Sequence, residues 1–201
     1  MEVVVVIVVL GALAAGAVAL SRRRSADAER RAVLERGALQ SPLDEQRMLT
    51  GDVRRLAPGD VVHHDGTDFL VDRTVEFDED GFRWHEHLLL DAIGGRRLWL
   101  SVEDDEGVEV AVWEKLGGLD LDPTAPEVVH EGVTYRREER GRARFVVREA
   151  AGERERGEME YADFVAGDKR LGFERYGTGG WETSLGTVVP EAALDVYPKG
   201  A

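Results

Sequence analysis

Apolar and polar residues alternate along most of the chain from residue 60 onward, with the period of two that is typical of β-strands. In the first such segment the alternation places four apolar residues on one face: Phe69, Val71, Val75 and Phe77. No segment beyond residue 60 has the helical period of an ordinary amphipathic helix. The pattern therefore predicts a mainly β fold class, with an all-β sandwich or barrel-like domain over residues 56–199.

A tight hairpin turn at Asp80-Gly81 leads into the next predicted strand, because Asp-Gly supplies the positive φ that such turns require. On that strand the alternation places Trp84, Glu86 and Leu88 on the inward face. A carboxyl group in this position is either a structural acceptor for N–H donors or an acid or base with a raised pKa. The surroundings of Glu86 in the fold therefore distinguish these two roles.

The domain divides into two halves, 56–122 and 127–199, at the prolines Pro123 and Pro126. Two pairs of short segments resemble each other across this boundary: 69–71 with 145–147, and 98–100 with 171–173. These matches predict an internal duplication, although strand-rich sequence also produces such matches by chance.

An apolar segment precedes the domain, from Val3 to Leu20, and it contains no charged side chain. A helix of this length spans roughly 27 Å, which is close to the hydrocarbon thickness of a bilayer. Residues 1–21 are therefore predicted to be a single transmembrane anchor that contacts membrane lipid through residues 3–20.

Charge on either side of the apolar segment predicts its orientation. The basic cluster Arg22-Arg23-Arg24 follows the segment, whereas only Met1-Glu2 precedes it. A cleaved signal peptide is the alternative, and Ala17-Val18-Ala19 resembles a cleavage site, but a secretory signal begins with a positive segment. Because positive residues stay on the cytoplasmic side, we expect the N-terminus outside and the domain in the cytoplasm. Residues 22–55 then form a basic juxtamembrane helical linker.

Composition and motifs exclude several classes of function. The formal net charge of −14 argues against nucleic-acid binding, which needs clustered Lys and Arg. The absence of cysteine excludes disulfides and thiolate catalysis. No nucleophile elbow or phosphate-binding loop is present, so the sequence predicts no catalytic residue and no cofactor.

Two histidines next to Glu86, together with Glu86 itself, are weak candidates for metal ligands. His85 and His87 fall on one face of their strand, about 7 Å apart, and could contribute two ligands. His63 or His64 could complete a site from a neighbouring strand, but no spacing fixes a third ligand. The alternative is a pair of solvent-facing histidines, so no metal site is predicted.

Several spaced motifs of the domain resemble the bacterial family of the domain of unknown function 4178. They are Gly59-Asp60-Val61, Phe69-Leu70-Val71, the segment 84–90 around Glu86, the segment 99–103, and later Glu160 to Phe164, Phe173 to Tyr176 and Trp181-Glu182. The resemblance covers roughly residues 56–190 and departs at His87, where the family usually has tyrosine. It implies a membrane-associated accessory role and brings no catalytic residue with it.

The sequence therefore predicts a membrane-anchored cytoplasmic accessory or scaffold protein with a non-enzymatic β-rich binding module and a protein partner. The alternative is a small-ligand or metal-dependent enzyme that uses Glu86 with His85 and His87.

Overall fold

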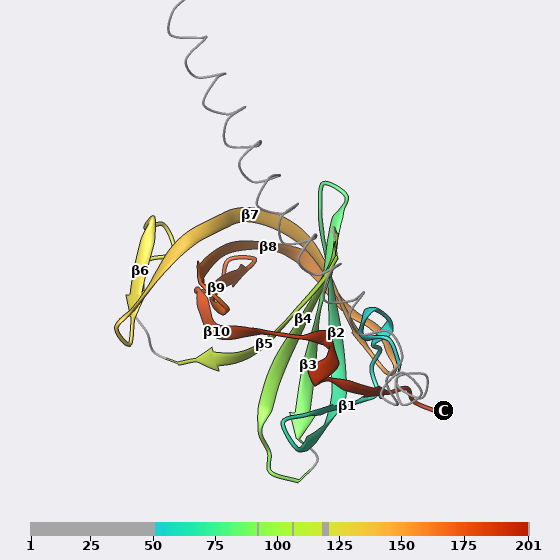
Figure 1. Ribbon diagram of the computed structural model, residues 1–201. Helices are drawn as coiled ribbons and strands as arrows, with labels where there is room; N and C mark the ends of the chain where they lie inside the picture. The colour runs from blue at the N-terminus through green and yellow to red at the C-terminus, as the bar shows by residue number, and fades with distance from the viewer. Residues whose placement is uncertain (1–50, 92, 106, 118–120, 201) are drawn as a thin grey trace, which may run out of the picture. The chain divides into compact units, whose positions relative to one another are not determined.

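The computed structural model describes residues 51–200, apart from residues 92, 106 and 118–120. The predicted anchor, most of the predicted linker and their orientation lie outside these residues. Among the residues that the structure describes, no helix reaches the length and apolarity that crossing a bilayer requires. The mainly β fold class is confirmed, since strands make up most of the described chain (Figure 1).

In the described part of the chain, eleven strands form one antiparallel sheet, with one short 3-10 helix before β1 and another between β10 and β11. In chain order the elements are η1 (Val53–Arg55), β1 (Val61–His64), β2 (Thr67–Glu79), β3 (Phe82–Asp91), β4 (Arg97–Asp104), β5 (Val108–Leu116), β6 (Glu127–His130), β7 (Val133–Glu149), β8 (Gly152–Ala166), β9 (Lys169–Tyr176), β10 (Glu182–Val189), η2 (Glu191–Ala193) and β11 (Asp195–Tyr197). Their order across the sheet is β11-β1-β2-β3-β4-β5-β10-β9-β8-β7-β6.

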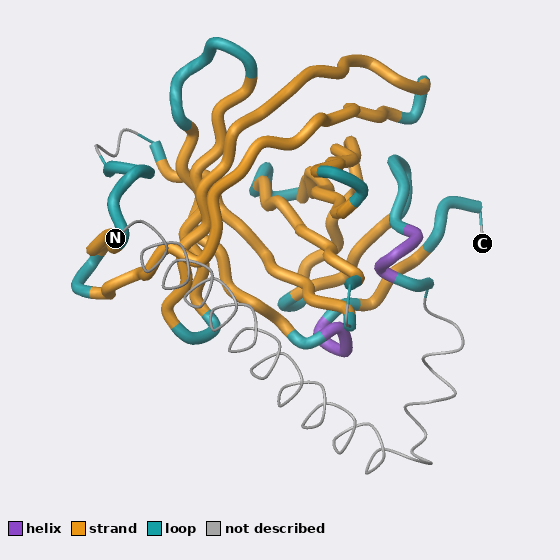
Figure 2. Tube along the Cα trace, turned by 90° about the horizontal axis from the view of Figure 1, so that it is seen from above, coloured by secondary structure: helices purple, strands orange, loops and turns teal. Residues whose placement is uncertain are grey.

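A further pairing closes this sheet into a barrel. Strand β2 pairs with β7 as well as with β3, so that eight strands form a ring: β2, β3, β4, β5, β10, β9, β8 and β7. The curved β7 and β8 wrap around one side of the ring, and β2 to β5 form the other side (Figures 1 and 2). A ring of this size has an interior that side chains fill or that holds one small ligand.

The predicted hairpin at Asp80-Gly81 is present, with both residues at positive φ (51° and 96°). The prediction that Phe69, Val71, Val75 and Phe77 share one face of β2 is wrong. A β-bulge lies between Val71 and Arg73 and shifts the alternation by one residue, as bulges do. Phe69 and Val71 therefore pack outside the ring, whereas Val75 and Phe77 point into it.

Three apolar clusters stabilise the domain, and only one of them lies inside the ring. Outside β2 to β5, a cluster around Leu89, Leu98 and Leu100 is covered by η1, β1 and β11. Outside β8 and β9, a second cluster is built around Phe164 and Phe173, with β6 packed on it through Val128. Both faces of the sheet are thus largely buried, and the ring interior is not the main core.

The two halves of the domain run through the same order of elements. Each begins with a short strand, a two-residue turn with positive φ, and a long bulged strand. The turns begin at Asp65 and Glu131, and the bulges follow Val71 and Arg137 at the same offset. The proposed alignment of segment 69–71 with 145–147 is wrong, since Phe69 lies outside the ring and Phe145 inside it. The duplication itself stays a prediction.

Candidate functional site

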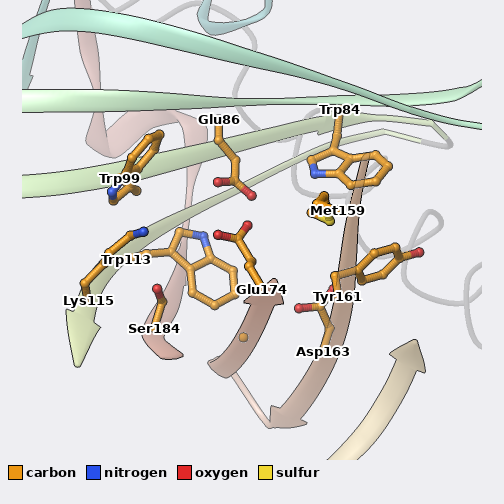
Figure 3. Close-up of a pocket in the computed structure, with 11 residues that line it drawn as sticks. Trp84, Glu86, Trp99, Trp113, Lys115, Met159, Tyr161, Asp163, Glu174 and Ser184 are labelled. Atoms are coloured by element: carbon orange, nitrogen blue, oxygen red, sulfur yellow. The ribbon is translucent and has the colours of Figure 1, made fainter. Parts of the chain in front are cut away.

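A cavity that is partly open to solvent lies inside the ring. Its wall combines aromatic, acidic and small residues from six strands: Trp84, Glu86, Trp99, Trp113, Lys115, Met159, Tyr161, Asp163, Gly172, Glu174 and Ser184 (Figure 3). A second hollow shares part of this wall, including Trp84, Trp113 and Asp163. The interior of the ring is therefore lined by tryptophans and carboxyl groups.

The alternation of the strands explains why these side chains point inward. On β4, Leu98, Leu100 and Val102 pack in the outer cluster, so Trp99 and Ser101 necessarily face the ring interior. On β9, Leu171 and Phe173 pack outside in the same way, and Gly172 and Glu174 face inward. The apolar positions of these strands therefore pack in the outer clusters, and the positions with polar and aromatic residues face the cavity.

Trp113 lies flat against a wall made of glycine. A Cβ atom on Gly186 would lie 2.5 Å from the Cε3 atom of the Trp113 ring, and one on Gly172 would lie 3.2 Å from Cζ3. The indole Nε1–H donates a hydrogen bond of 2.9 Å to Oγ of Ser101, which fixes the orientation of the ring. Glycine at these positions therefore makes the space that this tryptophan occupies.

Trp84 is held by a group of aromatic side chains. Its ring stacks on Phe77 with centroids 4.9 Å apart and an interplanar angle of 12°. The Tyr161 ring meets it edge-on at 5.6 Å. Trp84 is half-buried and lines the cavity, so the prediction that it points inward together with Glu86 is confirmed.

The carboxyl groups of Glu86 and Glu174 meet at the centre of the cavity and share a hydrogen bond (Figure 3). The Tyr176 hydroxyl donates a further hydrogen bond of 3.2 Å to Oε2 of Glu174. Burial, and then the neighbouring charge of Glu174, raise the pKa of Glu86 well above its usual value. Burial also raises the pKa of Glu174, while Lys115 partly offsets this rise. Glu86 therefore carries the proton and donates a hydrogen bond to Glu174.

Asp163 is the third inward carboxyl group, and it is placed differently. Within the described part of the chain, no hydrogen bond or ion pair reaches its side chain from another protein group. Burial raises the pKa of Asp163 to about 8, and the negative charge of Glu174 adds to this rise. The Asp163 carboxyl group is consequently mostly protonated at neutral pH and directed into the cavity without a protein partner.

Lys115 is the one cationic residue among those that line the cavity of Figure 3. Its ammonium group forms an ion pair with Glu182 and lies 5.5 Å from the centroid of the Trp99 ring. The residue is exposed, which places it at the edge of the cavity and leaves the carboxyl groups at its centre without a bound cation.

The three weak metal candidates are not brought together. His85 and His87 share one face of β3 as expected, with ring centroids 6.2 Å apart, but Glu86 points to the opposite side, into the ring. Across residues 51–200, leaving the gaps aside, no group of three or more His, Asp or Glu side chains is placed to hold a metal ion.

The alternative interpretation of the histidines as solvent-facing is wrong for His87. Its ring is buried and its Nδ1 lies 2.9 Å from Oγ1 of Thr74. Burial lowers the pKa of His87 to about 3, so the imidazole is neutral at physiological pH. His85 is half-buried, and burial lowers its pKa as well. Both residues belong to the packing outside the ring.

Sequence reasoning identified Glu86 and Trp84 but missed most of the cavity wall. Trp113, Asp163 and Glu174 come from segments that read only as strands in the sequence. A signal was nevertheless present, since Glu174 alternates with the apolar Leu171 and Phe173 beside a glycine. Glu174 can be predicted to point inward only if both faces of the sheet are known to be buried.

Comparison with known proteins gives the chain's relatives. The sequence model of the family described as "Domain of unknown function (DUF4178)" matches residues 57–191. An uncharacterized protein of Mycobacterium tuberculosis is 37% identical over 170 residues, which cover 81% of each chain. An uncharacterized protein of Mycobacterium bovis matches to the same extent. No solved structure matches the chain significantly.

Proposed function

Because this chain belongs to the DUF4178 family, for which no activity is described, we propose its function from the geometry of the barrel. The protein is a membrane-anchored accessory protein, and its barrel is a non-enzymatic module that binds a small molecule inside the ring. Residues 3–20 anchor it, and the barrel lies in the cytoplasm. A protein partner, expected from the sequence, stays a prediction.

The observation that carries the proposal is the composition of the cavity wall. Small-molecule sites are concave, largely aromatic or apolar, and contain a few converging polar groups. The cavity has this composition, with three tryptophans around Glu86, Glu174 and Asp163. A module that served only as a scaffold would gain stability from a fully apolar interior, because buried carboxyl groups oppose folding at neutral pH.

Acid–base catalysis is the second candidate, and the Glu86–Glu174 pair is the observation that favours it. Two carboxyl groups that share a proton are a recurrent arrangement in acid–base enzymes. The combination of residues in the alternative interpretation of the sequence does not support this function, since His85 and His87 lie on the other side of β3 from Glu86.

A thermal-shift screen of the full chain, purified in a mild detergent, tests the binding function. The panel contains small amines, amino acids, sugars and carboxylic acids. At least one class should raise the unfolding midpoint, because a ligand that binds only the folded state stabilises it. The matched variants are Ser184→Leu, which fills the cavity, and Thr178→Leu, which adds the same side chain in an exposed turn.

The stabilisation should disappear in Ser184→Leu and persist in Thr178→Leu. A shift that persists in both variants would place the ligand elsewhere, and no shift in the wild type would refute a binding interior. Turnover of a stabilising compound, lost in Glu86→Gln, would favour the enzymatic candidate.

The membrane part of the proposal has a separate test. A reporter fused after Ala201 should behave as a cytoplasmic protein, and a C-terminal alkaline phosphatase fusion that is active in the periplasm would contradict the orientation. Exchanging Arg22, Arg23 and Arg24 for acidic residues should disturb the topology, since these are the dominant charges next to the apolar segment.

A further inference from the structure

The tryptophans of the cavity are suited to hold a positive charge. A cation within about 6 Å of a tryptophan ring face is attracted by the electron density of the ring. One of the cavity tryptophans already makes such a contact, since the Lys115 ammonium group lies 5.5 Å from the Trp99 centroid. Trp84 and Trp113 line the same space and carry no cation in the described structure.

The carboxyl groups supply the complementary negative charge. Glu86, Glu174 and Asp163 converge on the cavity, and only Lys115 among its lining residues is positive. The ionisable groups that face the three carboxyl groups come from every neighbouring strand: Tyr176 and Arg170 on β9, Tyr161 on β8, Lys115 and Glu109 on β5 and Glu182 on β10, with Glu103, Glu138 and Glu139 near Asp163. Glutamates outnumber the cationic groups in this set, and the two cations, Lys115 and Arg170, form ion pairs with Glu182 and Glu109.

Asp163 gives the second, independent observation. A buried carboxyl group normally has a hydrogen-bond donor or a cation beside it, because an unpartnered polar group inside a protein is unfavourable. Asp163 is half-buried, has neither within the described structure and points into the cavity.

We propose that the ligand is a small organic cation, an alkylammonium compound, whose charged group lies among Glu86, Glu174 and Asp163 and whose carbon chain lies against Trp84 and Trp113. This inference rests on the proposed binding function and specifies the class of ligand. An anionic ligand would meet the carboxylate of Glu174, and a neutral ligand would supply no charge to stabilise the ionised form of the three carboxyl groups.

Binding of such a cation is coupled to release of protons. The carboxyl groups are protonated in the empty cavity, and the cation favours their ionised form, so each carboxylate that pairs with it loses its proton to solvent. Affinity should consequently increase with pH up to about pH 8, by up to about tenfold per pH unit for each proton released.

The test uses three probes of one size and different charge: n-butylammonium, 1-butanol and butyrate. Isothermal titration of the full chain in detergent should show binding of n-butylammonium alone. Its affinity should be higher at pH 8 than at pH 6, and titrations in buffers of different ionisation enthalpy should show proton release.

Two variants on β8 serve as the matched pair. Asp163→Asn keeps the shape of the protonated carboxyl group and should weaken n-butylammonium binding by about tenfold or more, with an unchanged circular dichroism spectrum. Glu158→Gln removes an acidic charge at an exposed position of the same strand and should leave the affinity unchanged.

The outcomes separate the two proposals. Binding of 1-butanol or butyrate as tight as that of n-butylammonium, or equal affinity in Asp163→Asn, would overturn the cation inference and leave the binding function standing. A sugar or a carboxylic acid as the only stabilising class in the thermal-shift screen would have the same consequence. Absence of any stabilising compound in that screen would refute both.

Discussion

Replacing Glu86 with glutamine removes the proton that Glu86 shares with Glu174 while keeping the shape of the side chain. The glutamine amide can donate the hydrogen bond to Glu174 that the protonated carboxyl group donates in the wild type. The difference between the two proteins is therefore confined to ionisation: the wild-type group titrates and the glutamine does not.

The sign and size of the effect follow from the raised pKa of Glu86. A carboxyl group with a raised pKa in the folded state stabilises the fold at low pH, and this contribution is lost as the pH rises from its ordinary value of 4.5 through the folded-state pKa. The free energy of unfolding of Glu86→Gln should therefore increase relative to the wild type over this range. The slope is at most about 1.4 kcal/mol per pH unit, because one proton is involved.

Urea titrations followed by tryptophan fluorescence at pH 5, 6, 7 and 8 measure this difference. Glu158→Gln is the control, because it removes an exposed glutamate and should follow the wild-type profile. Glu86→Ala should be less stable than Glu86→Gln at every pH, since it leaves Glu174 without its donor. Parallel profiles for wild type and Glu86→Gln would refute a carboxyl group that is held protonated in the cavity.

Three further substitutions test the packing around the cavity in the same denaturation assay. Trp84→Ala should lower the free energy of unfolding by about 2–4 kcal/mol through lost aromatic contacts, and a loss below about 1 kcal/mol would contradict its inward position. Gly186→Ala should lower it by about 1–3 kcal/mol and shift the fluorescence of Trp113, whereas Gly180→Ala, which has open space, should change little. His87→Gln should have a lower free energy of unfolding than the wild type near pH 7. This difference should shrink by up to about 1.4 kcal/mol per pH unit as the pH falls from 6.5 to 4.5, because the buried wild-type imidazole resists protonation. A difference that stays constant with pH would contradict the lowered pKa of His87.

Local alternation predicted the strands well, because a period of two depends only on neighbouring residues. The inward face of β3 and the hairpin at Asp80-Gly81 are examples. The alternation failed where the backbone departs from regular pairing. The bulge between Val71 and Arg73 reverses which face of β2 each later side chain is on, and no residue in that segment predicts the bulge.

The composition of the cavity could not be predicted because it depends on pairings between distant strands. Glu86 meets Glu174 only because β5 pairs with β10 and β2 pairs with β7, which closes the ring. The sequence also leaves open which face of a strand is the interior when both faces are buried. Leu98 and Leu100 mark the outer cluster, so the less apolar side with Trp99 faces the cavity, against the usual expectation.

The hydrogen-bond partners of the three carboxyl groups distinguish a structural role from a binding role. A structural carboxylate is saturated by donors, as Asp60 is by the backbone N–H groups of Ala57 and Lys199. Asp163 accepts no such bond in the described structure, and Glu86 finds its partner in another acid. Each of these groups makes the empty fold less stable at neutral pH than an apolar residue of the same volume would. In the proposed complex the cation would stabilise the ionised carboxyl groups, and ligand binding should increase stability most at the pH where the ligand-free protein is least stable.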